Sequence, residues 1–216
     1  PVLYTNPMQT LTSTLTLSNR HSLKIVGDLS LPELPPNTAP KGLLFLQHGL
    51  GSYRSTPSLI AIADTFLANG YAVFNFDATN AAGESEGRYE DATMQRHYDD
   101  LVDVIAWAKD QPWFISPFIL CGHSLGGYAV ARYAEDHPEE VKAVFPFAHV
   151  VSGALTHEAN KRFKPEKFED WKKTGWFTRI SNSKPGLVLR LPWSHMEERL
   201  NHDLLPNADK LTMPVL

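Results

Sequence analysis

The sequence predicts an α/β fold with a mostly parallel sheet flanked by helices. Two observations support this prediction. Short, almost wholly apolar runs recur along the chain, and such runs are typical of strands that are buried on both faces of a parallel sheet. Stretches with helical spacing of apolar residues alternate with these runs, as successive β–α–β units require. We expect an N-terminal antiparallel hairpin and an inserted cap in addition to this core.

The N-terminal part of the chain predicts the hairpin. Residues 11–17 alternate apolar and polar side chains, as a strand buried on one face does. Residues 23–31 form the second strand, and a turn at residues 18–20 joins the two. A proline-rich loop over residues 32–40 then leads into the body of the fold.

The body of the fold alternates buried strands with helices. Apolar runs predict the strands, which we place at residues 42–47, 71–76, 114–121 and 141–147. Apolar residues at helical spacing predict the helices, which we place at residues 58–69, 93–109 and 125–135. Within the longest of these helices, we interpret the polar residues 97–100 as solvated charge opposite the core face.

The chain changes character after residue 151. Residues 152–206 are polar, aromatic and irregular, and we interpret them as a cap or lid inserted over the end of the sheet. Residues 207–216 return to the core, where the chain stops inside the opening of another buried strand. The first part of the core is therefore residues 1–151. The aromatic residues of the cap either line a pocket or form a small core of the cap itself, because pockets and cores share this composition.

Composition limits the class of protein. The 216 residues are 43% hydrophobic and 20% charged with a net charge of −4, which is ordinary for a globular protein and unlike a basic nucleic-acid-binding domain. No apolar run reaches the roughly 18 residues that a membrane span needs. The single cysteine, Cys121, allows no intrachain disulfide, and the N-terminus lacks a signal-peptide pattern. We predict a soluble, cytoplasmic protein with no nucleic-acid partner, and leave a homodimer open.

A motif for a serine nucleophile lies at Gly122-His123-Ser124-Leu125-Gly126, which matches G-x-S-x-G. A nucleophile at the tip of a tight strand-to-helix turn has a strained backbone. Side chains two residues to either side would collide across that turn, and glycine has none. N–H groups at the start of the following helix then point toward the reacting carbonyl oxygen. We predict Ser124 as the nucleophile, with Gly122, His123 and Gly126 supporting the turn.

A second segment, residues 83–87, also matches G-x-S-x-G, with Ser85 at its centre. It lies between two loops, whereas Ser124 follows an apolar strand and opens a helix rich in small residues. Because the motif needs a strand–turn–helix setting, we interpret Ser85 as a loop serine. Cys121 ends the strand three residues before Ser124, and we interpret it as a small buried residue and not as a nucleophile.

Two backbone N–H groups are predicted to stabilise an oxyanion beside the serine. One belongs to Leu125, the residue after the nucleophile. We assign the other to Leu50, in a glycine-containing loop over residues 48–52 that follows an earlier buried strand. Gly49 lets this loop turn sharply. His48 is interpreted as bracing the loop and not as a catalytic base, since it precedes the serine in the chain; the alternative for the whole loop is a generic glycine-rich turn.

These motifs resemble those of the α/β-hydrolase superfamily, in particular its esterase and serine-aminopeptidase-like branch, which includes cinnamoyl and feruloyl esterases and monoacylglycerol-lipase-like enzymes. The matching stretches are residues 46–49, 76–77 and 83–87 and the turn at Gly122. The resemblance implies a serine hydrolase that cleaves a small-molecule carboxylic ester through an acyl-enzyme, without a cofactor. An amide or peptide hydrolase of the same fold, or a catalytically silent small-molecule-binding domain, are the alternatives. No cluster of histidine and cysteine predicts a metal site.

The resemblance also implies that the catalytic acid and histidine lie beyond Leu216. In this family the acid follows the strand that begins here near Met213, and the histidine follows one further strand. About two more β–α units, roughly 40 to 60 residues, would hold both. We interpret His137 as a surface residue, His149 as a pocket or loop residue, and the cap histidines as solvated or capping side chains. These cap histidines are His157, His195 and His202.

Overall fold

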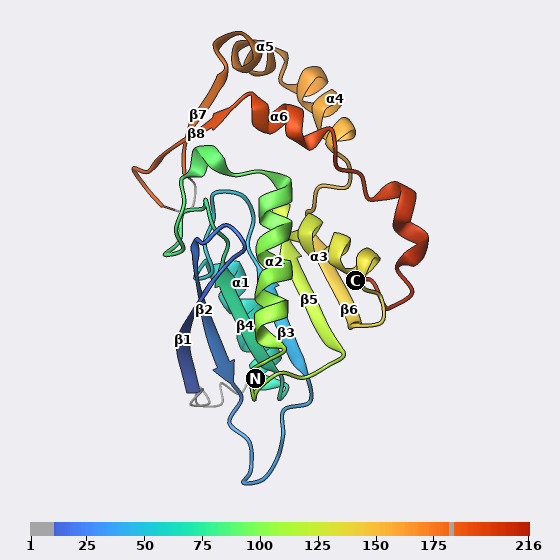
Figure 1. Cartoon of the computed structure of the whole chain (residues 1–216). Helices are drawn as coiled ribbons and strands as arrows, with labels where there is room; N and C mark the ends of the chain where they lie inside the picture. The colour runs from blue at the N-terminus through green and yellow to red at the C-terminus, as the bar shows by residue number, and fades with distance from the viewer. Residues whose placement is uncertain (1–10, 182–183) are drawn as a thin grey trace, which may run out of the picture.

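The computed structural model describes residues 11–181 and 184–216. Its centre is a six-stranded sheet in the order β1-β2-β4-β3-β5-β6 (Figure 1). β2 pairs antiparallel with β1 and β4, and the remaining neighbours pair in parallel. The strands are β1 (Leu11–Ser18), β2 (Lys24–Leu31), β3 (Leu43–Gln47), β4 (Ala72–Asp77), β5 (Phe118–His123) and β6 (Val141–Phe147). The predicted mostly parallel sheet with an N-terminal hairpin is confirmed.

Helices cover both faces of the sheet. In Figure 1, α2 and α3 lie in front of the sheet and α1 lies behind it. These helices are α1 (Pro57–Ala68), α2 (Met94–Ala108) and α3 (Leu125–Asp136), and a 3-10 turn, η1 (Tyr89–Asp91), precedes α2. The start of α2 follows from its sequence, because the Thr93 hydroxyl accepts a hydrogen bond from the Arg96 N–H at 3.0 Å.

The main core lies between the sheet and the helices α2 and α3. Every residue of β3 and β4 is buried, as expected for strands that are covered on both faces. Phe45 and Phe118, from the neighbouring strands β3 and β5, meet edge to face with ring centroids 5.1 Å apart. Leu101 and Ile105 of α2 pack into the same cluster. The faces of the sheet are thus filled by core, and the loops at its end are left to form a site.

The strand predicted at residues 114–121 begins later than expected. β5 starts at Phe118, and residues 114–117 precede the sheet. Pro117 has no N–H to donate, so a strand that is paired on both sides, as β5 is, would lose a ladder hydrogen bond there. Phe114 and Ile115 still pack against the core as partly buried side chains, which explains why the apolar run extends beyond the strand.

The cap, predicted to be irregular, consists largely of regular elements. Figure 1 shows them gathered beyond one end of the sheet. They are α4 (Gly153–Phe163), α5 (Pro165–Thr174), β7 (Trp176–Ile180), β8 (Val188–Pro192) and α6 (Ser194–Arg199). A 3-10 turn, η2 (Leu205–Lys210), follows them and lies beside α3 (Figure 1). β7 and β8 pair antiparallel as a separate two-stranded sheet. Strands of five residues are too short for sequence periodicity to distinguish them from loops.

One carboxylate of the cap closes the N-terminal end of α2. Glu198 accepts hydrogen bonds from the N–H groups of Met94 and Gln95, each at 3.0 Å. The same carboxylate lies 2.6 Å from His202 Nε2, and His202 Nδ1 lies 2.8 Å from the Tyr128 hydroxyl of α3. Burial opposes ionisation of Glu198, but these hydrogen bonds lower its pKa. Glu198 and His202 therefore attach the cap to both α2 and α3.

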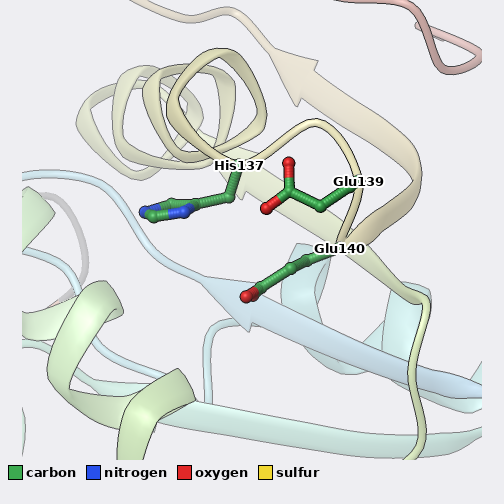
Figure 2. A group of neighbouring side chains, drawn as sticks. All are labelled: His137, Glu139 and Glu140. Atoms are coloured by element: carbon green, nitrogen blue, oxygen red, sulfur yellow. The ribbon is translucent and has the colours of Figure 1, made fainter.

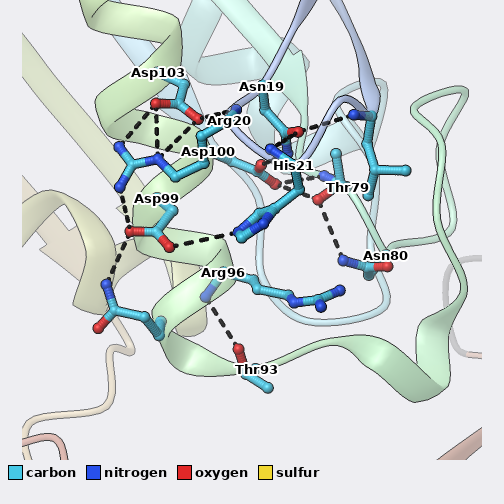
Figure 3. A network of polar contacts seen from close by, with 12 residues as sticks. Asn19, Arg20, His21, Thr79, Asn80, Thr93, Arg96, Asp99, Asp100 and Asp103 are labelled. Atoms are coloured by element: carbon cyan, nitrogen blue, oxygen red, sulfur yellow. Dashed lines mark hydrogen bonds and ion pairs between the residues drawn. The ribbon is translucent and has the colours of Figure 1, made fainter.

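A polar network fastens the β1–β2 turn to α2 (Figure 3). The buried Asp100 accepts hydrogen bonds from the Asn19 side chain at 2.7 Å and from the N–H and hydroxyl of Thr79 at 2.6 and 2.8 Å. Arg20 pairs with Asp103 at 2.8 Å. The interpretation of residues 97–100 as solvated charge is therefore wrong. Loops far away in the sequence supply the donors, so that these polar groups can be buried.

The last residues return to the sheet beside β6. Val215 forms a parallel bridge with Val144. The Val144 N–H donates to the Pro214 carbonyl at 3.0 Å, and the Val144 carbonyl accepts from Leu216 at 3.1 Å. This pairing agrees with the predicted opening of a further strand, but Val215 and Leu216 are exposed and not buried as expected. Across the described ranges, the structure contains no helix of the length and apolar character that would be needed to cross a membrane.

Replacing Glu198 with alanine should lower the free energy of unfolding by about 2 kcal/mol, because two helix N–H groups and His202 lose their acceptor. Glu197→Ala is the matched control, since the neighbouring carboxylate is exposed; we expect a change of about 0.5 kcal/mol or less. Urea denaturation measures both. Equal effects of the two variants would contradict the role given to Glu198.

Asp100 should make stability depend on pH. Burial raises the pKa of Asp100 to about 6, against the opposing effect of its hydrogen bonds. Between about pH 4 and 6 the folded protein then holds a proton that the unfolded chain has lost, so the free energy of unfolding falls as the pH rises. Asp100→Asn removes this titration. Thermal unfolding at several pH values measures this effect. The stability of the variant should fall less steeply with rising pH in this window than that of the parent protein, whatever its absolute stability.

Candidate active site

Ser124 occupies the tight turn between β5 and α3. Its backbone angles, φ 54° and ψ −111°, lie in a region that residues other than glycine rarely adopt. Hydrogen bonds hold this conformation on both sides. The Ser124 N–H donates to the Phe147 carbonyl at 3.0 Å, and the Ser124 carbonyl accepts from the Tyr128 N–H at 3.1 Å. The partly exposed serine therefore stands at a strained strand-to-helix turn, as the motif predicts.

Glycines make this turn sterically attainable. A Cβ atom on Gly122 would overlap the Gly126 carbonyl, and one on Gly126 would overlap the carbonyl oxygens of Gln47 and His48. The turn is therefore closed both on itself and against the end of β3. Gly49, in the loop after β3, is also close to the serine, because a Cβ atom on Gly49 would lie 3.0 Å from Ser124 Cβ.

The loops that carry the two predicted oxyanion donors meet at Ser124. Leu125 is the first residue of α3, so its N–H has no acceptor within the helix. Leu50 follows Gly49, and its side chain packs against the apolar cluster that contains Leu125. The Leu50 N–H donates to no protein group in the part of the chain that the structure describes. Both N–H groups are thus unengaged beside the serine, and their role as donors stays a prediction.

His48 braces the loop after β3, as expected. Its buried ring lies 2.8 Å from the Gly49 carbonyl through Nδ1, and its Nε2 accepts the Ala78 N–H at 2.9 Å. The His48 carbonyl lies 2.8 Å from His97 Nε2 in α2. Burial lowers the pKa of both histidines, that of His97 to about 3. His48 is therefore neutral, with its hydrogen on Nδ1, and has no free nitrogen to accept a proton from Ser124.

The second G-x-S-x-G segment has a structural role. The Ser85 hydroxyl donates to the Asp77 carbonyl at 2.6 Å and accepts from the Val26 N–H at 2.8 Å. A Cβ on Gly83 would overlap the Asp77 carboxylate, which forms a buried ion pair with Arg54. The segment thus wraps the end of β4. Both hydrogen-bonding functions of Ser85 are occupied, in agreement with its interpretation as a loop serine.

Cys121 is buried at the end of β5, and burial raises the pKa of its thiol to about 12. A thiol that stays protonated is a poor nucleophile, so the interpretation of Cys121 as a packing residue agrees with the structure.

Two cap histidines, expected to be solvated or capping side chains, are buried and are therefore not solvated. His195 Nδ1 lies 2.7 Å from the Ala92 carbonyl, and its Nε2 accepts from Arg199 Nε at 2.9 Å. Burial lowers the pKa of His195 to about 4, so the ring is neutral. His202 is held between Glu198 and the core as described above. His195 and His202 form hydrogen bonds with residues from other elements. The sequence around the two histidines does not indicate these partners.

Between residues 11–181 and 184–216, no histidine or carboxylate forms a hydrogen bond with the Ser124 hydroxyl. His149 lies at the same end of the sheet, since a Cβ on Gly127 would lie 2.6 Å from His149 Cβ. It thus occupies the pocket or loop position that was expected. The predicted location of the acid and the base beyond Leu216 stays a prediction.

A cavity of about 310 Å³, here called the cap cavity, lies between the cap and Leu50. Its apolar wall is formed mainly by Phe168, Trp171, Phe177, Leu191 and Met196. Three of these, Trp171, Leu191 and Met196, are also the small core of the cap. The cap aromatics therefore fulfil both roles that composition left open. Phe177, Arg179 and Leu191 face the cavity from β7 and β8, and the sequence did not reveal this because runs of five residues show too little periodicity.

One group of possible metal ligands is present among the described residues: His137, Glu139 and Glu140, in the loop between α3 and β6 (Figure 2). Both oxygens of Glu140 are already engaged, one with Lys109 at 2.6 Å and one with the Tyr133 hydroxyl at 2.7 Å. The group precedes β6 and is therefore at the other end of this parallel strand from Ser124. We interpret it as a partly exposed ion-pair cluster.

The fold, the strained serine and the adjoining glycine loop define an α/β-hydrolase. Residues 38–196 match the family model described as serine aminopeptidase, S33, and the chain belongs to this family of hydrolases. The chain is 30% identical over 203 residues to palmitoyl-protein thioesterase ABHD10, mitochondrial, of Bos taurus, covering 91% of the chain and 63% of the relative. For the protein of the same name from Homo sapiens, the identity is 28%, with 87% and 60% covered. The chain thus spans about three fifths of these curated relatives.

Solved structures show the same fold. Est1E from Butyrivibrio proteoclasticus with bound ferulic acid superposes with a TM-score of 0.74 at 20% identity, covering 93% of this chain and 76% of that one. Alpha/beta hydrolase domain-containing protein 10 from mouse superposes with a TM-score of 0.70 at 22% identity, covering 94% and 75%. The expected superfamily and fold are confirmed, whereas the cytoplasmic location and the homodimer stay predictions.

Gly126→Ala tests the close contact between α3 and β3. Alanine normally stabilises a helix relative to glycine by about 1 kcal/mol. Here the added Cβ would overlap two backbone carbonyls, so the free energy of unfolding should instead fall by about 3 kcal/mol. Gly42→Ala is the control, because its Cβ would meet only the Tyr71 ring at 3.2 Å, and we expect a loss of about 1 kcal/mol or less. A stabilised Gly126→Ala variant would contradict the contact.

Proposed function

We propose that the protein is an esterase or thioesterase that forms an acyl-enzyme on Ser124. The observation that carries this proposal is the strained backbone of Ser124 between β5 and α3, with the Gly49 loop directly beside it. Such a turn exposes a hydroxyl to a carbonyl carbon and aims helix N–H groups at the carbonyl oxygen. The relatives named as palmitoyl-protein thioesterases, and the likeness to Est1E, support an ester or thioester over other acyl compounds.

In the proposed reaction, Ser124 Oγ attacks the carbonyl carbon of the substrate. The Leu50 and Leu125 N–H groups hold the resulting oxyanion. Collapse of the tetrahedral intermediate releases the alcohol or thiol, and water then hydrolyses the acyl-enzyme to a carboxylic acid. A histidine oriented by an acid must take the Ser124 proton and return it to the leaving group. None of the described residues supplies that histidine to Ser124, so the proposal rests on the nucleophile and its oxyanion loops.

Two other functions have a specific observation in their favour. The family description names a serine aminopeptidase, which favours cleavage of an amide. The lack of a hydrogen-bonded base at Ser124 among the described residues favours a domain that binds a small molecule without reaction. Turnover of p-nitrophenyl butyrate and butyryl thiocholine, compared with an aminoacyl p-nitroanilide, separates the ester, thioester and amide activities.

A fluorophosphonate probe tests the nucleophile directly. We expect one phosphonyl adduct per protein molecule when the histidine that activates Ser124 is present, because only an activated serine reacts with the probe. Ser124→Ala should lose the adduct completely. Ser85→Ala, which removes the serine of the second matching motif, should keep it. Intact-mass spectrometry followed by peptide mapping measures all three proteins.

Labelling at Ser85, or equal labelling of the parent protein and the Ser124→Ala variant, would reject Ser124 as the nucleophile. A folded parent protein that gains no adduct would reject the hydrolase proposal for this chain and favour the binding domain.

A further inference from the structure

The cap cavity has a cationic lining. Lys164, Lys167, Arg179 and Arg199 all border it, whereas none of the carboxylates in the described ranges does. The rest of its wall is apolar or neutral. A cavity for a wholly apolar acyl chain needs no charged side chain, and placing cations beside apolar walls costs solvation free energy.

Arg179 brings one of these charges to the oxyanion loop. In the β7–β8 hairpin Arg179 pairs opposite the buried Leu189, so it lies on the face that is turned toward the core of the protein. Its Nη2 donates a hydrogen bond to the Leu50 carbonyl at 3.3 Å and would lie 3.0 Å from a Cβ on Gly51. No carboxylate of the described residues lies within ion-pair distance of Arg179.

Arg199 brings a second charge to the same cavity from α6. Its Nε donates to His195, but its two Nη groups have no hydrogen-bond partner among the residues that the structure describes. Arg199 is partly exposed, and the burial of the rest of its side chain lowers the pKa of its guanidinium. The neighbouring Glu198 carboxylate is already engaged with the start of α2 and with His202. A partly buried cation that forms no ion pair is stabilised when an anion binds.

The charge of the whole chain is likewise more positive in the cap than in the rest of the protein. Residues 152–206 contain ten lysine and arginine residues against seven aspartate and glutamate residues. The rest of the chain has ten basic against seventeen acidic residues, and the net charge of the protein is −4. A positive cap above a negative core attracts an anionic molecule to the cavity and repels it from the remaining surface.

We propose that the cap cavity binds an anionic group, a carboxylate or a phosphate, on an otherwise apolar acyl substrate. Arg179 and Arg199 hold the anion, and the exposed Lys164 and Lys167 attract it at the mouth. Guanidinium groups present paired N–H donors that match the oxygens of both anions. The aromatic wall holds the chain that joins this group to the ester. This proposal rests on the proposed function in one respect, because it places the anion and the ester in the same molecule.

Ligand binding tests the proposal without relying on catalysis. The full chain with Ser124→Ala is titrated by calorimetry with monomethyl suberate, octyl phosphate and the neutral dimethyl suberate. The two anionic probes should bind at least about tenfold more tightly than the neutral one, as expected of charge-assisted hydrogen bonds. Adding Arg179→Gln or Arg199→Gln should remove most of this preference, because the affinity for the anionic probes should fall far more than the affinity for dimethyl suberate.

Arg190→Gln is the matched control. Arg190 lies in the same hairpin, but it is exposed on the opposite face, over the Trp176 ring at 4.4 Å. This variant should keep the preference for anions. Because Arg199 also contacts His195, its substitution could disturb the fold, so Arg179→Gln provides the second variant and thermal unfolding checks both.

Tighter binding of monomethyl suberate identifies a carboxylate site, and tighter binding of octyl phosphate a phosphate site; either supports the proposal. Equal affinity for the neutral and anionic probes overturns it, as does an equal loss in Arg190→Gln and Arg179→Gln. Anion preference in a protein that no fluorophosphonate labels would reject the esterase but keep the anion site. Labelling at Ser124 without anion preference would support the esterase and reject the anion site.

Discussion

The contact between Gly126 and the end of β3 is the constraint on which the site depends. Because Gly126 has no side chain, the first turn of α3 can lie directly on the carbonyls of Gln47 and His48. That contact places Ser124 in its strained conformation and brings it to within contact of Gly49. The strain is small compared with the packing energy of two buried strands and a helix, which is why the surrounding core can maintain it.

Buried neutral histidines transmit this arrangement to the rest of the core. The Gln47 side chain donates to the His97 carbonyl at 2.8 Å, and the ring of His97 in turn contacts the backbone of His48. The ring of His48 then reaches Ala78 after β4. The loop that carries Leu50 is therefore fixed to β3, β4 and α2 together. Imidazole suits this role because one ring offers a donor and an acceptor, provided that it remains uncharged.

The cap depends on the same helices. Glu198 and His202 attach it to α2 and to Tyr128, which lies one turn after Ser124 in α3. Its own core of Trp171, Leu191 and Met196 faces Leu50 across the cap cavity. The cap thus supplies the wall and the positive charge of the cavity, whereas the sheet supplies Ser124, the proposed nucleophile. Under the proposed function, specificity and reactivity belong to separate parts of the chain.

The sequence by itself determined the parallel sheet, the order of its elements, and Ser124 as the serine with the strand–turn–helix setting. These features follow from short-range patterns: apolar runs, helical spacing, and glycines two residues on either side of a turn. Only the tertiary structure decided that Asp100 and His195 are buried, and that Arg179 and Arg199 border one cavity. Their partners, such as Asn19 for Asp100 and Ala92 for His195, lie about 80 and 100 residues away. The local sequence around a polar side chain is the same whether water or a distant backbone group satisfies its hydrogen bonds. Periodicity therefore cannot predict which of the two occurs.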